Sequence, residues 1–567
     1  MPAEDFERTA FDYVIVGAGP AGCVLANRLS ADPGTTVLLL EAGGPDKARE
    51  IRIPAAFSKL FATPYDWNYR TVKQPRLADR ELFWPRGKTL GGSTSINAQM
   101  WIRGCAADYD GWGVEGWSYA EVLPYFQRIE RRVGVKSTDG SGGSSGAESG
   151  AHGTYGTDGP LWIDELRSPN PITAAFLEAC VAEGIPATAD LNGPDNSGCS
   201  RTPVTQHRGA RFSAADAYLR PARRRPNLTV RTGAIVDRLR LSEPARAATP
   251  AKTPAKTPAK TGEAAKRRVI GVSYRDHDRG GAVREVTAQR EVLLCAGAVN
   301  TPQILQLSGI GDPDVLRAAG VEPLHELPGV GTNLQDHLST GVVVTCPQPI
   351  TMFAAESLGS VARYLFGRTG MLSSNIAEAV AFIAPDPGTP PEIELIFAPV
   401  PFVEHGMVPP PAHGLTIGVV LLQPRSRGTV GIAGPTAAEP VIEPGYLGDE
   451  ADLRRLIWGV RVAERIARSS ALAPFVGAPM APYTGVLDDD GLAESIRRHS
   501  ETLYHPVGTC RMGTDDGAVV DPSLRVRGLA GLRVVDASVL PAINRGHTMA
   551  PVYMVAEKAA DLILAGQ

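Results

Sequence analysis

The 567-residue sequence lacks the features that mark several classes of protein. Its seven cysteines are an odd number and widely scattered, with no CxxC pair and no Cys/His cluster at metal-ligand spacing, which argues against a disulfide framework or a zinc site. No apolar run reaches the ~18 residues of a membrane span. The first ten residues, MPAEDFERTA, have neither the positive start nor the apolar core of a secretory signal. We therefore expect free thiols, no metal centre and no integral membrane span.

The sequence also lacks a large excess of positive or negative charge. The net charge is −4, and basic residues are spread along the chain apart from two short clusters, Arg220 to Arg225 and Lys266 to Arg268. A broad cationic face for nucleic acid is therefore not expected. The length predicts two joined domains. We expect a cytoplasmic protein, with peripheral attachment to a membrane left open.

The most informative stretch runs from Phe11 to Gly43 and reads as strand, tight turn, helix and strand. Gly17, Gly19 and Gly22 have the GxGxxG spacing, in which glycines permit a sharp turn, approach of the backbone to a pyrophosphate, and close packing of helix on strand. Glu41 ends the second strand, nineteen residues after Gly22, where a carboxylate can accept hydrogen bonds from ribose hydroxyls. The stretch predicts a dinucleotide site without a 2′-phosphate, and by itself it does not separate NAD from FAD.

A second loop, from Pro85 to Gly104, reads PRGKTLGGSTSINAQMWIRG. Gly91 and Gly92, followed by Ser93, offer N–H and hydroxyl donors that suit a phosphate or the polar edge of a flavin ring. The structural alternative is a helix N-terminus capped by Ser93.

Two segments have biased composition. Lys136 to Gly159 is rich in Gly and Ser, and Ala248 to Lys266 repeats PAKT, so neither is expected to form packed structure. The second segment interrupts Leu228–Leu241 and Val269–Tyr274, which we interpret as a hairpin.

The other elements follow from hydrophobic pattern. Ile51–Tyr69 is loop-like, and Asp452–Arg468 has the spacing of an amphipathic helix. Further strands are expected at 291–294, 379–383, 392–398, 415–422 and 532–535. Asp536 directly follows the last of these, at the strand end where ligands of a doubly wound sheet gather.

Two histidines near the C-terminus are candidates for acid–base chemistry. Oxidising an alcohol leaves a proton on oxygen, and neutral imidazole is a natural acceptor near neutral pH. A second polar side chain would orient the alcohol oxygen. His505 in YHPVGTCRMG and His547 in INRGHTMAP have the right chemistry, although either alone is more often structural.

Six linked motifs together resemble the glucose/methanol/choline (GMC) family of FAD-dependent oxidoreductases, in the family's order and over almost the whole chain. They are VIVGAGPAGCVLANRLS, PRGKTLGGSTSINAQMWIRG with the following ADYDGWG, CAGAVNTPQILQLSGIG, LPGVGTNLQDH, YHPVGTCRMG and DASVLPAINRGHTMAP. The resemblance implies a mixed α/β fold. A Rossmann-like FAD-binding domain, residues 10–342 with 490–567 and insertions at about 136–159 and 245–266, is interleaved with an antiparallel-sheet substrate domain, residues 343–489.

The resemblance also implies the cofactor and its site. FAD is expected to be dissociable, because Ile96 stands near the position where some family members carry a tethering histidine. The implied FAD-binding residues are Gly17, Gly19, Gly22, Glu41, Ala42, Gly91, Gly92, Ser93, Asn97, Val236, Asp536, Ala537, His547 and Thr548.

By resemblance His505 is the catalytic base and His547 its partner in the oxidation of an alcohol to an aldehyde or ketone, with hydride transfer to flavin N5. His207, His337 and His499 have no motif support and are taken as ordinary polar residues. Oxygen, a quinone or another carrier remains open as the electron acceptor.

Substrate and alternative functions are less constrained. Asn375 and Glu378 are polar where the substrate domain is expected to meet the flavin, and Glu378 could balance a cationic alcohol such as choline, although strand-edge polarity explains both equally well. The same scaffold also serves fatty-acid photodecarboxylases and hydroxynitrile lyases, but the intact histidine pair favours oxidation. A scaffold protein with a vestigial flavin site is disfavoured by the intact glycines and Glu41.

Overall fold

The computed structural model describes residues 8–132, 155–242, 267–277, 280–436 and 439–566. The two segments of biased composition lie outside these ranges, except for residues 155–159. Those five belong to ordered structure, since the Gly159 amide donates to the carbonyl of Glu130. The expected insertion therefore ends earlier than position 159.

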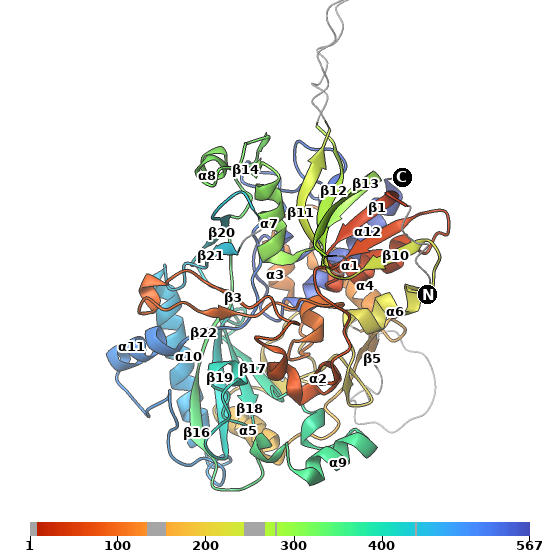
Figure 1. Cartoon of the computed structure of the whole chain (residues 1–567). Helices are drawn as coiled ribbons and strands as arrows, with labels where there is room; N and C mark the ends of the chain where they lie inside the picture. Colours follow the sequence, from red (N-terminus) through yellow and green to blue (C-terminus); the bar gives the residue numbers. More distant parts are fainter. Residues whose placement is uncertain (1–7, 133–154, 243–266, 278–279, 437–438, 567) are drawn as a thin grey trace, which may run out of the picture.

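The first sheet carries the predicted dinucleotide-binding unit (Figure 1). Its parallel strands are β1 (Ala10–Val16), β2 (Val37–Leu40), β10 (Leu228–Arg231), β13 (Ala282–Leu294) and β23 (Leu532–Val534), in the spatial order β10-β2-β1-β13-β23. β13 is long enough to pair β23 along its second half and the antiparallel β12 (Val269–Asp276) along its first. β12 also pairs β11 (Ala234–Leu241), which confirms the predicted hairpin. The expected first strand, 228–241, is divided, because its first residues form β10 and pair β2 instead.

The second sheet is antiparallel throughout and has the order β22-β16-β19-β18-β17-β7 in the described residues. Its strands are β7 (Gly198–Arg201), β16 (Leu338–Thr345), β17 (Ala379–Ile383), β18 (Ile393–Ala398), β19 (Gly414–Leu421) and β22 (Glu501–Thr502). The mixed α/β fold class is confirmed. The sheet takes β7 and β22 from outside 343–489, so the two sheets are interleaved along the chain, and the division at residues 342/343 and 489/490 stays a prediction.

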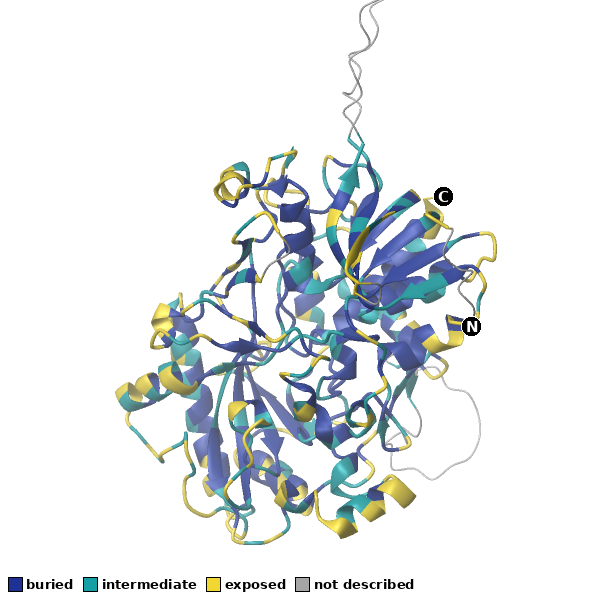
Figure 2. Ribbon diagram, in the orientation of Figure 1, coloured by how far each residue is buried: buried dark blue, intermediate teal, exposed yellow. Residues whose placement is uncertain are grey.

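Helices cover both sheets and bury their apolar faces. α1 (Pro20–Leu29) lies against the parallel sheet and α12 (Met549–Ala565) packs on α1, whereas α5 (Pro171–Ala182) and α10 (Glu450–Arg468) lie against the antiparallel sheet. The remaining longer helices are α4 (Tyr119–Ile129), α7 (Gly297–Leu307), α9 (Leu358–Gly367) and α11 (Asp489–His499). Figure 2 shows the resulting two buried cores, one at each sheet.

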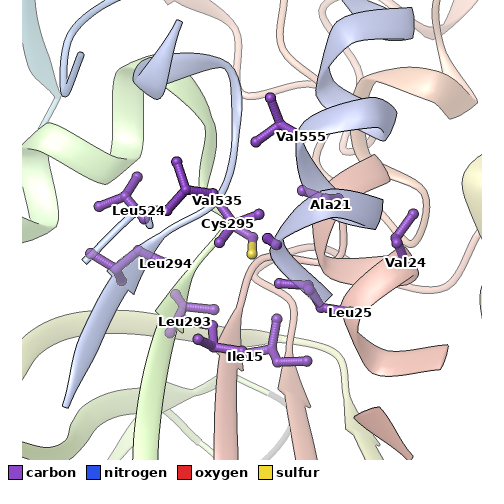
Figure 3. Packing of buried hydrophobic residues seen from close by; sticks show 14 of the residues in the cluster. Ile15, Ala21, Val24, Leu25, Leu293, Leu294, Cys295, Leu524, Val535 and Val555 are labelled. Atoms are coloured by element: carbon purple, nitrogen blue, oxygen red, sulfur yellow. The ribbon is translucent and has the colours of Figure 1, made fainter. Parts of the chain in front are cut away.

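The core beneath the nucleotide-binding unit joins both ends of the chain. Figure 3 shows Ile15 of β1 and Leu25 of α1 packed with Val535 and Val555 from the C-terminal region. The C-terminal segment therefore completes the N-terminal unit, which is why residues near 505 and 547 can meet residues near 17 and 97.

One local prediction and one structural alternative are wrong. Residues 51–69 are not a simple loop, because they include the end of α2 (Arg49–Arg52) and a 3-10 helix at Pro54–Leu60, with Ile51, Phe57 and Leu60 buried. Ser93 is not a helix cap. It lies inside a 3-10 helix, Gly92–Ser95, and its hydroxyl accepts a hydrogen bond from the Gly87 amide.

Candidate active site

One cavity of about 1220 Å3 brings most of the predicted site residues together. It is lined by Gly17, Gly19, Glu41, Ala42, Gly92, Ser93, Asn97, Val236, Asn375, His505, Asp536, Ala537, His547 and Thr548. Gly22, Gly91 and Glu378 are not among the lining residues. The cavity therefore connects the glycine loops to both C-terminal histidines.

The two glycine loops lie against each other at one part of this wall. The Gly91 amide donates to the Ala18 carbonyl at 2.8 Å. A Cβ on Gly92, whose φ is +52°, would lie 2.7 Å from the Cα of Gly19, whereas a Cβ on Gly19 would meet nothing within 4 Å. Gly92 is thus required for the contact between loops, and Gly19 faces open space where a phosphate could approach the backbone.

Glu41 fixes the turn beside that space. Its carboxylate accepts hydrogen bonds from the amides of Ala18, at 2.8 Å, and Gly43, at 2.9 Å. Burial raises the pKa of Glu41 to about 7, against the lowering effect of these two amides. Ala42 and Val236 line the cavity nearby, so this part of the cavity has the sequence-predicted features of a nucleoside site.

Asp536 follows β23 at the same carboxyl edge of the parallel sheet. Its carboxylate accepts from the Gly297 amide and the Thr301 hydroxyl of α7, and from the Ser538 amide and hydroxyl. These four donors occupy the carboxylate oxygens, and burial raises the pKa of the group. The side chain therefore holds α7 against the turn whose residues Asp536 and Ala537 line the cavity.

Asn97 lies between the glycine loops and the histidines. Its Oδ1 accepts from the buried Arg211 guanidinium at 2.7 Å, and its Nδ2 lies 3.1 Å from the sulfur of Met549. Burial lowers the pKa of Arg211 to about 9. Both neighbours restrict the rotamers of Asn97, so the amide stands at a fixed position in the wall.

His505 and His547 meet at right angles in the same wall. Their ring centroids are 4.8 Å apart and their planes make an angle of 82°. The backbone around His505 is fixed by Asp336, whose carboxylate accepts from the His505 amide at 2.7 Å and from the hydroxyls of Thr502 and Tyr446. Tyr504, just before it, has φ +70°, a conformation that costs free energy in a non-glycine residue.

His337, taken from the sequence as an ordinary polar residue, contacts His505 directly. Its Nδ1 lies 3.0 Å from Nδ1 of His505, and its Nε2 lies 3.0 Å from the carbonyl oxygen of Leu422. Burial lowers the pKa of His337 to about 3, and burial also lowers the pKa of His505 well below its ordinary value, with the neighbouring His547 and His337 adding to the effect. Both rings are therefore neutral near pH 7.

With both rings neutral, these contacts favour one pair of tautomers. A carbonyl oxygen only accepts, so the proton of His337 is on Nε2 and its Nδ1 carries a lone pair. His505 must then donate Nδ1–H to that lone pair. Its own Nε2 is left without a proton.

Glu394 is a second residue that the sequence did not single out. Its Oε1 lies 3.0 Å from Nε2 of His547, its side chain is fully buried, and its Oε2 has no hydrogen-bond partner in the described part of the chain. His405 was also missed. It lines the cavity and its Nδ1 lies 2.7 Å from the hydroxyl of Tyr504.

The two predicted substrate residues have different positions. Asn375 lines the cavity, donates Nδ2–H to the Ala98 carbonyl, and leaves its buried Oδ1 without a partner among the described residues. Glu378 faces away, because its carboxylate accepts from the Asn170 amide and from the hydroxyls of Thr173 and Ser374. Glu378 thus ties down the N-terminus of α5 and is not placed to balance a cationic substrate.

The antiparallel sheet supplies an apolar wall. One face of three neighbouring strands is turned to the cavity. It is lined by Ser339, Gly341 and Val343 of β16, Ile396 and Ala398 of β18, and Thr416, Gly418 and Val420 of β19, with Thr340 of β16 also at the cavity. From Val420, near the histidines, to Thr416 the wall extends over about 13 Å at a strand rise of ~3.3 Å per residue. At the Thr416 end, the cavity reaches surface residues 407–411.

Comparison with known proteins assigns the family. The N-terminal and C-terminal models of the GMC oxidoreductase family match residues 11–339 and 424–556. The chain is a GMC oxidoreductase. It is 47% identical to an uncharacterised GMC-type oxidoreductase of Mycobacterium tuberculosis, over 98% of this chain and 99% of that protein. It is 37% identical to an alcohol dehydrogenase [acceptor] of Pseudomonas putida, over 98% and 96% of the two chains.

A solved structure supports the cofactor assignment. Aspergillus oryzae formate oxidase, in a structure concerned with modification of its FAD, matches this GMC oxidoreductase with a TM-score of 0.86 and 27% identity, covering 99% of both chains. The cofactor of this chain is FAD, and it is an oxidoreductase of the family that acts on alcohol-type substrates. The open space at Gly19 and a cavity continuous from Glu41 to His505 fit an elongated dinucleotide.

Two searches concern the described residues alone. Within those ranges no helix combines the length and apolar character needed to cross a bilayer. The same part of the chain contains no group of three or more His, Cys, Asp or Glu side chains arranged to hold a metal ion.

Proposed function

We propose that this GMC oxidoreductase oxidises the CH–OH group of an uncharged, largely apolar alcohol to the corresponding aldehyde or ketone, with His505 as the proton acceptor and FAD bound without a covalent link. The single observation that supports the base assignment is the chain of contacts from Leu422 through His337 to His505, because it leaves Nε2 of His505 unprotonated in the cavity wall.

Different side chains of the site are proposed to accept the proton and to hold the cofactor. The alcohol O–H proton passes to Nε2 of His505 while the C–H bond of the carbinol carbon breaks and the C=O bond forms. When bound, FAD supplies the acceptor for the hydride that leaves the carbon. Gly19, Glu41, Gly92 and Asn97 would hold that cofactor, from its phosphates to its ring.

His547 is proposed to orient the alcohol oxygen from the other side. Because the buried carboxylate of Glu394 lies against its Nε2, a positive charge on His547 would be compensated, and the ring could then stabilise alkoxide character as the proton leaves. His505, flanked by the neutral His337, has no such compensation and remains a neutral base.

The apolar wall supports the substrate class. Val343, Ile396, Ala398 and Val420 face the cavity along the wall that runs from the histidines to residues 407–411, and the carboxylate of Glu378 is bound to the N-terminal region of α5. An alkyl or aromatic body would bury apolar surface along this wall, whereas a quaternary ammonium group would lose the partner that Glu378 was expected to provide.

The test is anaerobic mixing of the FAD-loaded protein with a panel of alcohols while the visible absorbance of the flavin is recorded. Medium-chain and benzylic alcohols should bleach the flavin, with choline much slower. His505→Ala should retain flavin and slow bleaching by roughly 10²-fold or more. His207→Ala is the matched control, since His207 packs on Trp162 and does not line the cavity. Bleaching at an unchanged rate in His505→Ala would refute the assigned base.

A further inference from the structure

Exposed apolar side chains are concentrated in two short segments. In the described residues, twelve large hydrophobic side chains are exposed, and six of them fall within residues 353–366 or at 407–408. They are Phe353, Leu358, Leu365, Phe366, Met407 and Val408, of which Leu358 is 90% and Phe366 92% exposed. The other six are scattered singly. We call the six residues in the two segments, Phe353, Leu358, Leu365, Phe366, Met407 and Val408, the apolar face.

The two segments lie at the same end of the antiparallel sheet. Thr345, at the end of β16, pairs with Gly414 at the start of β19, and Ala398, at the end of β18, pairs with Thr416. The connections 346–378 and 399–413 therefore leave the sheet together. The two connections are in contact, since the ring centroids of Phe353 and His413 are 4.8 Å apart and the Met352 amide donates to the Pro399 carbonyl.

One side of helix α9 packs on the protein and the other side is exposed to solvent. Tyr364 is buried and its hydroxyl donates to the Arg52 carbonyl at 3.0 Å. Leu358, Ala362 and Leu365, at the spacing of one helix face, are all exposed, and α9 lies at the outer edge of the molecule (Figures 1 and 2). Keeping this much apolar surface in water is unfavourable, which indicates a partner.

Charge indicates the kind of partner. Arg363 on α9 and Arg368 just after it are exposed, and Arg167 and Arg208 lie on the adjoining segments that meet Arg368 around Gly209. Residues 357–368 contain no acidic side chain. The acids on the adjoining segments are Glu356, which is paired with Lys59, and Glu404, Asp164 and Glu165. A short amphipathic helix with exposed Leu and Phe, flanked by an excess of arginines, suits an anionic bilayer surface.

We propose that the apolar face rests on an anionic lipid bilayer. Leu358, Leu365 and Phe366 enter the boundary between headgroups and acyl chains, and the arginines contact lipid phosphates. Met407 and Val408, together with Pro409 to Pro411, also line the active-site cavity. Docking therefore turns the cavity opening toward the lipid. The route that this orientation offers an apolar alcohol, from the bilayer along the sheet wall, rests on the proposed function. The docking itself does not rest on the proposed function.

The experiment is flotation of the FAD-loaded full-length protein with vesicles, without substrate. One set contains phosphatidylcholine alone and the other roughly three parts phosphatidylglycerol to seven parts phosphatidylcholine. We expect binding to the anionic vesicles that weakens when salt is raised to about 0.5 M. L365S/F366S and, separately, R363E should each lower the bound fraction roughly five-fold or more.

Controls separate docking from folding and from catalysis. Val283→Ser and Leu564→Ser remove exposed apolar side chains from other parts of the surface and should bind vesicles like the unmodified chain. Retention of flavin absorbance checks the fold of each variant, and R363E keeps the test open if L365S/F366S does not fold. Alcohol bleaching in detergent-free buffer reports the proposed function separately.

Two results would overturn the proposal. The first is absence of binding to either vesicle, or equal binding by both face variants and the unmodified chain. The second is a dimer in solution that L365S/F366S converts to a monomer, with no vesicle binding, since the face would then cover a second copy of the chain.

Discussion

The buried carboxylate of Glu394 lies 3.0 Å from Nε2 of His547, and the two residues are 153 positions apart in the chain. The other imidazole of the pair, His505, contacts a neutral histidine instead. The two rings thus have unequal surroundings although both line the same cavity wall. We propose that this asymmetry lets His505 take the proton while His547 compensates the developing negative charge on oxygen.

Replacing Glu394 with Gln should slow alcohol-dependent bleaching of the flavin roughly ten-fold or more, because the amide keeps the volume but removes the compensating charge. Stopped-flow absorbance under anaerobic conditions measures the rate. Glu392→Gln is the matched control, since Glu392 lies two residues away and pairs with Arg455 instead. Equal rates in both variants would show that the charge of Glu394 does not contribute.

Replacing His337 with Leu should release the tautomer of His505 and slow bleaching roughly ten-fold while flavin stays bound. In the unmodified chain the pKa of His505 is lowered well below 6.5, so the base is neutral and the bleaching rate should be level from pH 9 to about pH 6.5 and below. His337→Leu should bleach the flavin more slowly than the unmodified chain throughout this pH range. A variant with the rate and pH profile of the unmodified chain would contradict the positioning role.

The same substitution should change how stability depends on pH. Below about pH 6.5 an unfolded histidine binds a proton, while folded His337, with a pKa of about 3, does not. The unfolded state then holds more protons than the folded state. The free energy of unfolding therefore decreases as the pH decreases, by about 1.4 kcal/mol per pH unit for this residue. Between pH 6.5 and 5, the Tm of His337→Leu should therefore decrease less steeply than that of the unmodified chain. Parallel curves would argue against a neutral His337.

Gly92→Ala should abolish or greatly weaken FAD binding. Its Cβ would lie 2.7 Å from the backbone of Gly19, at a positive φ that alanine disfavours, so the two glycine loops would separate. Flavin content after purification and titration with added FAD measure the effect. Gly111→Ala is the control, because a Cβ there meets nothing within 4 Å and the backbone φ is not positive.

Acid precipitation should release the flavin into the supernatant, because residues 85–104 contain no histidine and Ile96 is buried near the position where the family's tether occurs. Absorbance of the pellet and supernatant decides the matter. Yellow colour retained by the denatured pellet would show a covalent link and contradict the prediction.

Local patterns in the sequence were sufficient for much of the fold. The boundaries of β17 agree with those predicted, since a run of buried residues bounded by polar or turn residues specifies a strand over five positions. The spacing of Gly17 to Gly22 and the position of Glu41 fixed the nucleotide-binding unit in the same way. His505 and His547 were found because each lies in a motif shared with the family.

Only the tertiary structure could supply the neighbours of those motifs. His337 and Glu394 come from strands or strand ends more than 150 residues away from the histidines they contact, and no local period marks such a pairing. Glu378 illustrates the converse, because its polarity was visible in the sequence but its direction was set by the α5 N-terminus. The sequence by itself thus determined which residue types were available for redox chemistry, whereas the packing of two interleaved sheets decided which protons they carry and which surfaces they face.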